Sequence, residues 1–413
     1  FGDLKNTVND LKIRASYGTT GNFLDELAKP IGAFTYAEKY RTTDGFIFGD
    51  RYYNGLEYGD TPNPYVTWTT SKSYNAGLDF AFLNGKLSGA LDIFKRDETD
   101  ILASRTITLP DTYGRTLAKE NYAARSYRGG ELSLNWADQV GEVSYGVAAN
   151  IGYAVDRWDI YDEEPAWGPE GNQHFRSRVG RPHNRLIGLT AIDLVRTQEQ
   201  LDQLIAEGFT TYGRDPYLGM ILYKDIRGAD FTDGPDGKID ENDEDLLSQD
   251  NSPRYNYGLA LNASWRGISI SALFQGVLNY DRMISNQEGG GMRQHGSTFR
   301  PYYPIWADDV WTKDNPGAKY PAVVGQNWAE SGSMPSSFWM RSGGYMRLRD
   351  LNISYAVPSA WTEQIKLKNV NVFFNGSNLF VLSPMTEFHD PEQLNYDSYP
   401  VMKTFTLGLD VKF

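Results

Sequence analysis

The sequence predicts an all-β chain of 413 residues that forms an antiparallel β-barrel spanning a membrane. Three observations point to this fold. Apolar and polar residues alternate along ten stretches, the connections between the stretches are alternately short and long, and glycine (41 residues) and aromatic residues (14%) are abundant. No apolar run approaches the roughly 20 residues of a membrane helix. Because every backbone polar group must be satisfied inside a bilayer, only a closed barrel could place this chain there.

Each of the ten stretches is a predicted strand with one apolar and one polar wall, because successive side chains of a strand point to opposite faces. Ile268, Ile270 and Phe274 form one such apolar wall. A lumen closed by ten strands alone is narrow, whereas barrels of about 22 strands hold a polar plug, so we expect the chain to be part of a larger barrel. The stretches are residues 11–17, 74–82, 87–93, 132–136, 143–153, 257–265, 268–274, 351–357, 370–374 and 405–413.

The connections fall into two length classes that alternate without exception. Successive connections of an antiparallel barrel emerge at opposite ends, so the short turns share one end, on the periplasmic side, and the long loops share the other, outside the cell. A β-sandwich, which gives the same alternation of residues, has no reason to segregate its connections. The predicted extracellular loops are about residues 18–65, 103–119, 159–253, 284–344 and 385–400.

Charge and motif content exclude several functions. With 40 basic and 53 acidic residues the net charge is −13, so the basic footprint of a nucleic-acid binder is absent. The absence of cysteine excludes a disulfide scaffold, a thiolate metal site and a cysteine nucleophile. Four histidines occur without an HExxH motif, and neither a GxSxG nor a Walker motif is present. We therefore expect no enzyme activity.

The acidic residues concentrate in the predicted loop 159–253, which holds 20 acids and 9 bases, or −11 of the total charge. Within it, aspartates surround Gly237 in a pattern that resembles an EF-hand loop, where hard oxygen ligands surround a glycine in a sharp turn. This predicts a candidate Ca²⁺ site, with a solvated acidic turn as the alternative, and no other cofactor is expected. The candidate ligands are Asp233, Asp236, Asp240 and Asp243.

Aromatic residues of the long loops are candidate substrate contacts, because sugar faces and peptide side chains stack on rigid rings. The alternative is that these rings form the hydrophobic clusters that large loops need for their own stability. The candidates are Trp167, Trp306, Trp311, Trp328, Trp339, Tyr302 and Tyr303.

Two further local patterns are informative. A capping box of Thr197 and Gln200 predicts the start of a helix in the acidic loop, and Gly208 predicts its end. The predicted apolar stripe of this helix would pack its own loop or meet a partner protein. It consists of Leu201, Leu204 and Ile205. Three arginines before the eighth stretch are expected to pair with lumen or plug carboxylates, and they are Arg341, Arg347 and Arg349.

Specific strings along the whole chain resemble the C-terminal part of SusC/RagA-like TonB-dependent outer-membrane transporters of Bacteroidetes. They include LKIRASYGTTGN at 11–22, RYNYGLALNASWRGISISALFQG at 254–276 and FWMRSGGYMRLRDLNISYAVP at 338–358. The others occur in the order that the family has, at residues 63–102, 128–136, 237–247, 311–321, 371–380 and 399–413.

This resemblance implies the last ten or so strands of a 22-stranded barrel in the cell outer membrane. The plug domain and the TonB box of the family are absent from this chain, so both would belong to a missing N-terminal part. Such transporters import oligosaccharides or peptides with energy delivered through TonB. The implied partners are a SusD-like surface lipoprotein that forms a lid, the remaining N-terminal barrel and plug, TonB through that missing part, outer-membrane lipid, and a second pair in a dimer of SusCD complexes.

Two other functions stay open at the level of the sequence. One is a secreted β-rich module for glycan binding or adhesion, which would need no detergent and show no heat-modifiable gel shift. The other is a SusC-like barrel that serves as a structural component of an outer-membrane assembly, which would have stable machinery partners in place of a SusD-like lid.

Overall fold

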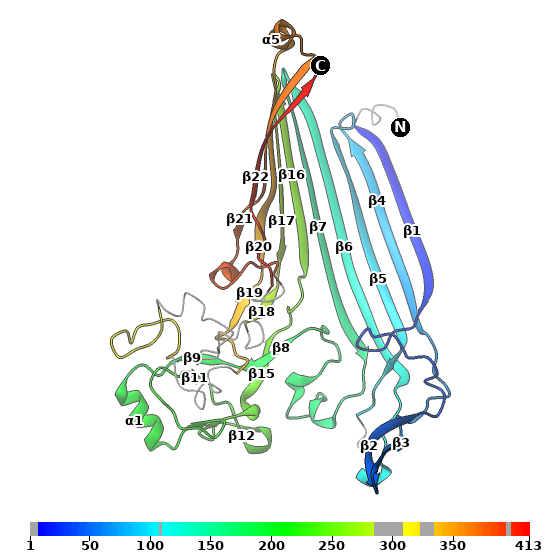
Figure 1. Ribbon diagram of the computed structural model, residues 1–413, viewed down its shortest axis with the longest axis vertical. Helices are drawn as coiled ribbons and strands as arrows, with labels where there is room; N and C mark the ends of the chain where they lie inside the picture. The colour runs from blue at the N-terminus through cyan, green and yellow to red at the C-terminus, as the bar shows by residue number, and fades with distance from the viewer. Residues whose placement is uncertain (1–6, 107–109, 285–308, 323–333, 394–397) are drawn as a thin grey trace.

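The predicted antiparallel sheet is confirmed. The computed structural model describes residues 7–106, 110–284, 309–322, 334–393 and 398–413, and its main sheet has ten strands, each hydrogen-bonded to the next one in sequence order (Figure 1). The strands are β1 (Val8–Asn22), β4 (Thr69–Phe82), β5 (Leu87–Ala103), β6 (Glu120–Val140), β7 (Val143–Ile160), β16 (Tyr255–Trp265), β17 (Ile268–Leu278), β20 (Tyr345–Ala356), β21 (Asn369–Leu382) and β22 (Thr404–Lys412).

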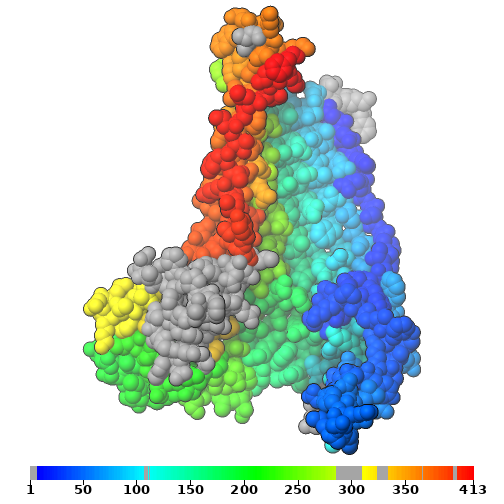
Figure 2. All heavy atoms as spheres, viewed as in Figure 1, coloured from blue at the N-terminus to red at the C-terminus, as the bar shows by residue number. Residues whose placement is uncertain are grey.

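Short and long connections lie at opposite ends of the sheet (Figure 1). The turn between β4 and β5 contains Asn84 and Gly85, both with positive φ, which suits the right-handed twist of a tight hairpin. The longest of the short connections joins β20 to β21 and carries α5 (Ser359–Thr362) and η7 (Glu363–Ile365). Figure 2 shows that the long connections form the wide lower part of the molecule, from which the sheet rises as a narrower wall.

The two faces of the sheet differ in chemistry. One face presents apolar side chains to the outside, as with Ile13, which is 81% exposed. The opposite face is polar, and there Arg14 of β1 bridges Asp79 of β4 (2.9 Å) and Asp92 of β5 (2.8 Å). Among the described residues, β1 and β22 each pair with a neighbour on one side only. The sheet is therefore a wall with two unpaired edges.

The connection between β1 and β4 contains a hairpin of β2 (Tyr40–Phe48) and β3 (Arg51–Tyr58), which the residue pattern does not predict. The connections after β7 and β17 contain short strands: β8 (Leu186–Leu189), β9 (Ala191–Leu194), β10 (Thr210–Thr211), β11 (Ile221–Tyr223), β12 (Arg227–Gly228), β13 (Thr232–Asp233), β14 (Lys238–Ile239), β15 (Glu244–Ser248), β18 (Asp281–Met283) and β19 (Met340–Ser342). The 3-10 helices of the long connections are η2 (Asp111–Tyr113), η3 (Pro165–Trp167), η4 (His174–Arg176), η5 (Ala229–Phe231), η6 (Glu241–Asp243) and η8 (Pro384–Glu387).

The main hydrophobic cluster of the described residues lies in these connections and not in the sheet. Its largest fully buried members include Trp339, Tyr320, Tyr223 and Met220. Three long connections, those after β7, β17 and β21, supply its residues, so they pack into one body at the lower end of the sheet (Figure 1). In the part of the chain that the structure describes, no helix has both the length and the apolar character to cross a membrane.

The predicted loop helix is present as α1 (Gln198–Ala206). Its capping box forms as expected, with the Gln200 amide donating to Thr197 Oγ1 (3.3 Å) and the Thr197 amide donating to Gln200 Oε1 (3.1 Å). Leu201 and Leu204 pack against the hydrophobic cluster of the long connections. Ile205 is 56% exposed, so the stripe that faces the loop is narrower than predicted.

Candidate functional site

The candidate calcium ligands lie in the turns between β12 and β15. Asp243 is fully buried, and its Oδ1 accepts hydrogen bonds from the amides of Ile226 (2.8 Å) and Arg227 (3.1 Å). Its Oδ2 accepts one from the amide of Asp240 (3.1 Å). Burial raises the pKa of the Asp243 carboxyl group despite these bonds. This carboxylate therefore serves as an internal acceptor for the backbone of the turn.

The other three candidates also support local turns. Asp240 accepts from the amide of Asn242 (2.8 Å), and Asp236 accepts from the amide of Lys238 (2.9 Å). Asp233 lies exposed in β13. Within the described ranges, no group of three or more His, Asp or Glu side chains is placed to hold a metal ion. The carboxylates do not gather as a ligand set in this arrangement, and the calcium site stays a prediction.

The candidate aromatic residues occupy different environments. Trp311 and Trp339 are buried in the hydrophobic cluster of the long connections, as the alternative interpretation expects. Trp167 ends η3 and is partly exposed. The structure does not bring these three rings together as a binding surface. The remaining candidates lie outside the described residues and are Trp306, Trp328, Tyr302 and Tyr303.

A β-bulge in β20 decides where Arg347 points. In the pairing of β20 with β17, Asp350 lies opposite Leu273 and Leu348 opposite Phe274, so Arg349 has no partner position. Because Arg349 is left out of the pairing, Arg347 lies opposite Gln275 and points to the polar face. Regular pairing without a bulge would have pointed Arg347 to the apolar face.

On the polar face, Arg347 binds the segment 383–393 of the connection between β21 and β22. Its guanidinium, whose side chain is 2% exposed, pairs with Asp390 and Glu392. Glu392 also accepts hydrogen bonds from Gln275 Nε2 (2.9 Å) and Tyr345 Oη (2.9 Å). The predicted pairing of this arginine with carboxylates is therefore present, and the carboxylates come from a long connection.

The 383–393 segment has a second attachment at Glu387. This carboxylate pairs with Lys319 and accepts a hydrogen bond from Tyr320 Oη (2.7 Å). Arg341, the second of the predicted arginines, lies 3.9 Å from it. Burial alone would raise the pKa of Glu387, but the bonds from Lys319 and Tyr320 outweigh it and lower this pKa. Arg349 is exposed and forms no ion pair among the described residues.

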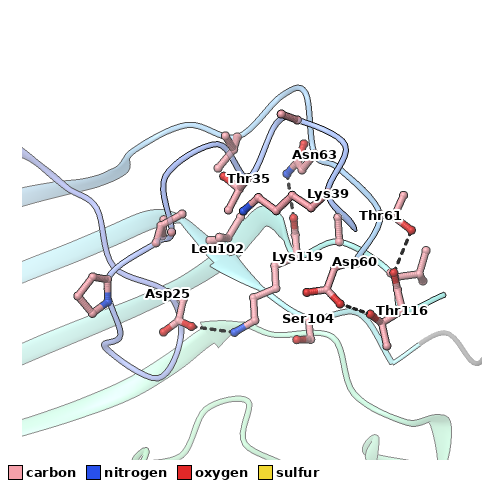
Figure 3. A pocket seen from close by; sticks show the side chains of 17 residues that line it. Asp25, Thr35, Lys39, Asp60, Thr61, Asn63, Leu102, Ser104, Thr116 and Lys119 are labelled. Atoms are coloured by element: carbon pink, nitrogen blue, oxygen red, sulfur yellow. Dashed lines mark hydrogen bonds and ion pairs between the residues drawn. The ribbon is translucent and has the colours of Figure 1, made fainter. Parts of the chain in front are cut away.

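A cavity of about 360 Å³ lies between the connection before β4 and the connection between β5 and β6 (Figure 3). Hydrogen bonds join the two connections around it. Asn63 Nδ2 donates to the Lys119 carbonyl (2.8 Å), and Thr116 Oγ1 donates to Asp60 Oδ1 (2.5 Å). The lining combines these polar groups with apolar side chains such as Leu102. Its volume lies near the lower end of the range of small-molecule pockets, which is roughly 300–1,000 Å³.

Lys119 forms ion pairs with two carboxylates beside this cavity. Lys119 Nζ pairs with Asp25 Oδ2 and Glu26 Oε1, both at 2.8 Å. Burial would raise the pKa of Asp25, but hydrogen bonds from Lys119 and from the amides of Lys29 and Leu27 lower it. Glu26 is buried, and its Oε2 has no hydrogen-bond partner among the described residues. The sequence pattern does not predict this cavity, because its walls come from connections far apart in the chain.

No protein-family model matches the chain. Named relatives do: TonB-dependent receptor P26 of Formosa agariphila is 26% identical over 100% of this chain and 41% of its own length. The TonB-dependent receptor SusC of Bacteroides thetaiotaomicron is 22% identical over 99% of this chain and 38% of its own length. The chain thus spans well under half of the length of these relatives.

Solved structures share the fold. The RagAB peptide importer in its open-open state matches with a TM-score of 0.70 and 20% identity over 99% of this chain and 40% of that chain. Its closed-closed state gives a TM-score of 0.68, with 20% identity over 99% of this chain and 41% of that chain. These relatives are named as receptors and importers, which agrees with the prediction that the chain is not an enzyme.

Proposed function

We propose that this chain, which is a SusC/RagA-like β-barrel portion, forms part of an outer-membrane transporter that imports oligosaccharides or peptides. The observation that carries the proposal is the sheet itself. One of its faces is apolar and the other polar, and its short connections lie at one end and its long connections at the other. A wall with an exposed apolar face suits lipid on one side and an aqueous lumen on the other.

The two unpaired edges of the sheet support a larger barrel. A transmembrane barrel has no free edges, because unpaired backbone groups in lipid are costly. We propose that β1 and β22 pair with further strands to complete a barrel of about 22 strands. The ion pairs of Arg14 with Asp79 and Asp92 would then face the lumen and its plug.

The long connections would capture the cargo outside the cell. Their shared hydrophobic cluster gives them a stable shape, and the cavity beside Lys119 and the polar face next to the 383–393 segment offer polar groups to a ligand. We propose that a SusD-like lipoprotein covers this end, that two such pairs associate, and that TonB drives transport through a part of the protein outside this chain. A bound Ca²⁺ in the acidic turns belongs to the same proposal, and metal analysis of the purified protein by mass spectrometry tests it.

Uptake by living cells tests the proposal as a whole. A strain without this protein should fail to grow on one class of oligosaccharide or peptide as sole nutrient, and the intact gene should restore growth. The protein should fractionate with the outer membrane and need detergent for extraction. Recovery from the culture medium without detergent would favour the secreted adhesion module. Unimpaired growth together with stable machinery partners would favour the structural role.

A further inference from the structure

One stretch of the acidic connection carries the opposite charge. The 22 residues from 171 to 192 contain four arginines and no aspartate or glutamate, although the stretch 159–253 around them has a net charge of −11. Arg176 pairs with Glu244 (2.8 Å). The other three, Arg178, Arg181 and Arg185, form no ion pair among the described residues, and all are partly exposed. We call these three residues the arginine cluster.

The arginine cluster is held beside the end of β7. The Gly180 amide donates to the Trp158 carbonyl (2.7 Å), and the Trp158 amide donates to the Arg181 carbonyl (3.3 Å). The His183 amide donates to Asp156 Oδ2 (3.3 Å), and Trp158 Nε1 donates to His183 Nδ1 (3.3 Å). These bonds fix the backbone that carries the arginine cluster at a defined position beside β7.

This position is on the polar side of the sheet. Asp156 and Trp158 alternate along β7 with Tyr153 and Val155, and Tyr153 belongs to the exposed apolar wall. Arg125, which lies opposite Trp158 in the sheet, points to the same side and pairs with Glu98 (3.2 Å). A lipid headgroup beside the apolar wall would thus not meet the cluster, whereas a molecule in the lumen would.

The hydrogen bonds of the cluster do not neutralise its charge. Arg178 donates to Tyr161 Oη (3.0 Å), Arg181 to the Phe175 carbonyl (2.9 Å) and Arg185 to the Arg176 carbonyl (3.2 Å). Such bonds leave further N–H donors on each guanidinium, because the group carries more donors than these acceptors use.

Glu163, the carboxylate whose charge acts on Arg185, already accepts other hydrogen bonds. Glu163 accepts hydrogen bonds from Ser177 Oγ (2.8 Å) and from the amides of Arg178 and Val179. Burial and repulsion from Arg181 and Arg178 lower the pKa of Arg185 to about 10, and the charge of Glu163 offsets this shift only in part. Cations held together in this way without a direct ion pair favour an anion, and guanidinium groups match carboxylates in geometry.

We infer that the arginine cluster binds the carboxylate groups of an acidic oligomer on the lumen side of the sheet. This inference rests on the proposed import function and narrows its cargo from oligomers in general to those that carry carboxylates. An acidic peptide and a uronate oligosaccharide both present this group, and the test separates the two.

Binding to the intact protein, purified in detergent, tests the inference by calorimetry. The probes are triglutamate and trigalacturonate, with trialanine and maltotriose as neutral counterparts. At least one acidic probe should bind roughly 10-fold or more tightly than its counterpart, and the R178Q/R181Q variant should weaken it by roughly 10- to 100-fold. The matched control R266Q removes an exposed arginine from the short turn between β16 and β17 and should leave affinity unchanged.

Tighter binding of one acidic probe identifies the cargo as an acidic peptide or as a uronate oligosaccharide. Equal binding of both probes identifies the carboxylate alone as the recognised group. The inference is overturned if neither acidic probe binds better than its counterpart, or if R178Q/R181Q binds as the wild type does. If that variant fails to fold, two other measurements test the inference. One is the affinity of the R178K/R181K variant for the acidic probes. The other is the affinity of the wild type between about 0.05 M and 0.3 M salt, which must fall because salt screens a charge-driven site. Uptake of neutral oligomers by a protein that binds neither acid would overturn this inference alone. Acid binding without any uptake would instead overturn the proposed function.

Discussion

Replacing Arg347 with methionine should release the 383–393 segment from the polar face. The side chain of Arg347 is 2% exposed, and its partners Asp390 and Glu392 are 16% and 25% exposed. Removing one partner of a buried ion pair costs about 3–5 kcal/mol. Glu392 keeps its bonds from Gln275 and Tyr345, so we expect the lower end, about 3 kcal/mol.

Hydrogen exchange followed by mass spectrometry measures this release directly. A local loss of about 3 kcal/mol corresponds to roughly 100-fold faster exchange in residues 383–393, with little change in β16 and β17. Arg349→Met is the matched control, because Arg349 is exposed two residues away and forms no ion pair among the described residues. Unchanged exchange in Arg347→Met, or equal acceleration in both variants, would refute the reasoning.

Three further predictions concern the apolar face of the sheet, the helix α1 in the connection after β7, and the pH dependence of the 383–393 segment. Ile270→Arg on the apolar wall should destabilise the membrane-inserted barrel by about 2–4 kcal/mol, seen as loss of its heat-modifiable band, while Ser271→Arg on the polar wall should be tolerated. Thr197→Ala should remove the capping box of α1 and cost about 1 kcal/mol, measured as faster exchange in that helix alone. Because the pKa of Glu387 is lowered from 4.5, its ionised form stabilises the 383–393 segment above that pH, and this contribution is lost as the pH falls toward the lower folded-state value. Hydrogen exchange in residues 383–393, corrected for the intrinsic pH dependence of exchange, should accelerate below about pH 4.5, and Glu387→Gln should remove this acceleration.

The sheet was predictable because its physics is local and repetitive. Alternation marks each wall, and the sorting of connections by length needs only their order along the chain. The hairpin of β2 and β3 escaped prediction, since Phe46, Ile47 and Phe48 are consecutive, all exposed, and obey no alternation. The capping box of α1 was readable because its two partners are three residues apart.

The candidate site was less predictable because it depends on contacts between distant segments. The acidic turn suggests ligands by composition, yet whether Asp243 faces a metal or a backbone amide is set by how β12 meets η6. The rings of Trp311 and Trp339 could have served either substrate or packing, and only the tertiary arrangement assigns them to the cluster. The arginine cluster had a visible signal, an acid-free stretch within an acidic connection, which has meaning only once its position beside β7 is known.

Residue 349 has no partner in β17, and the bulge that it forms decides which side chains at the start of β20 point to the apolar face and which to the polar face. If residue 349 paired regularly with Phe274, without the bulge, Leu348 would lie opposite Gln275 and Arg347 opposite Gly276, so a leucine would point to the polar face and a guanidinium to the apolar face. Deleting residue 349 would straighten the strand and keep these orientations, so the faces taken by the residues from Leu348 back to the strand's first residue, Tyr345, depend on residue 349 staying out of the pairing and not on its side chain.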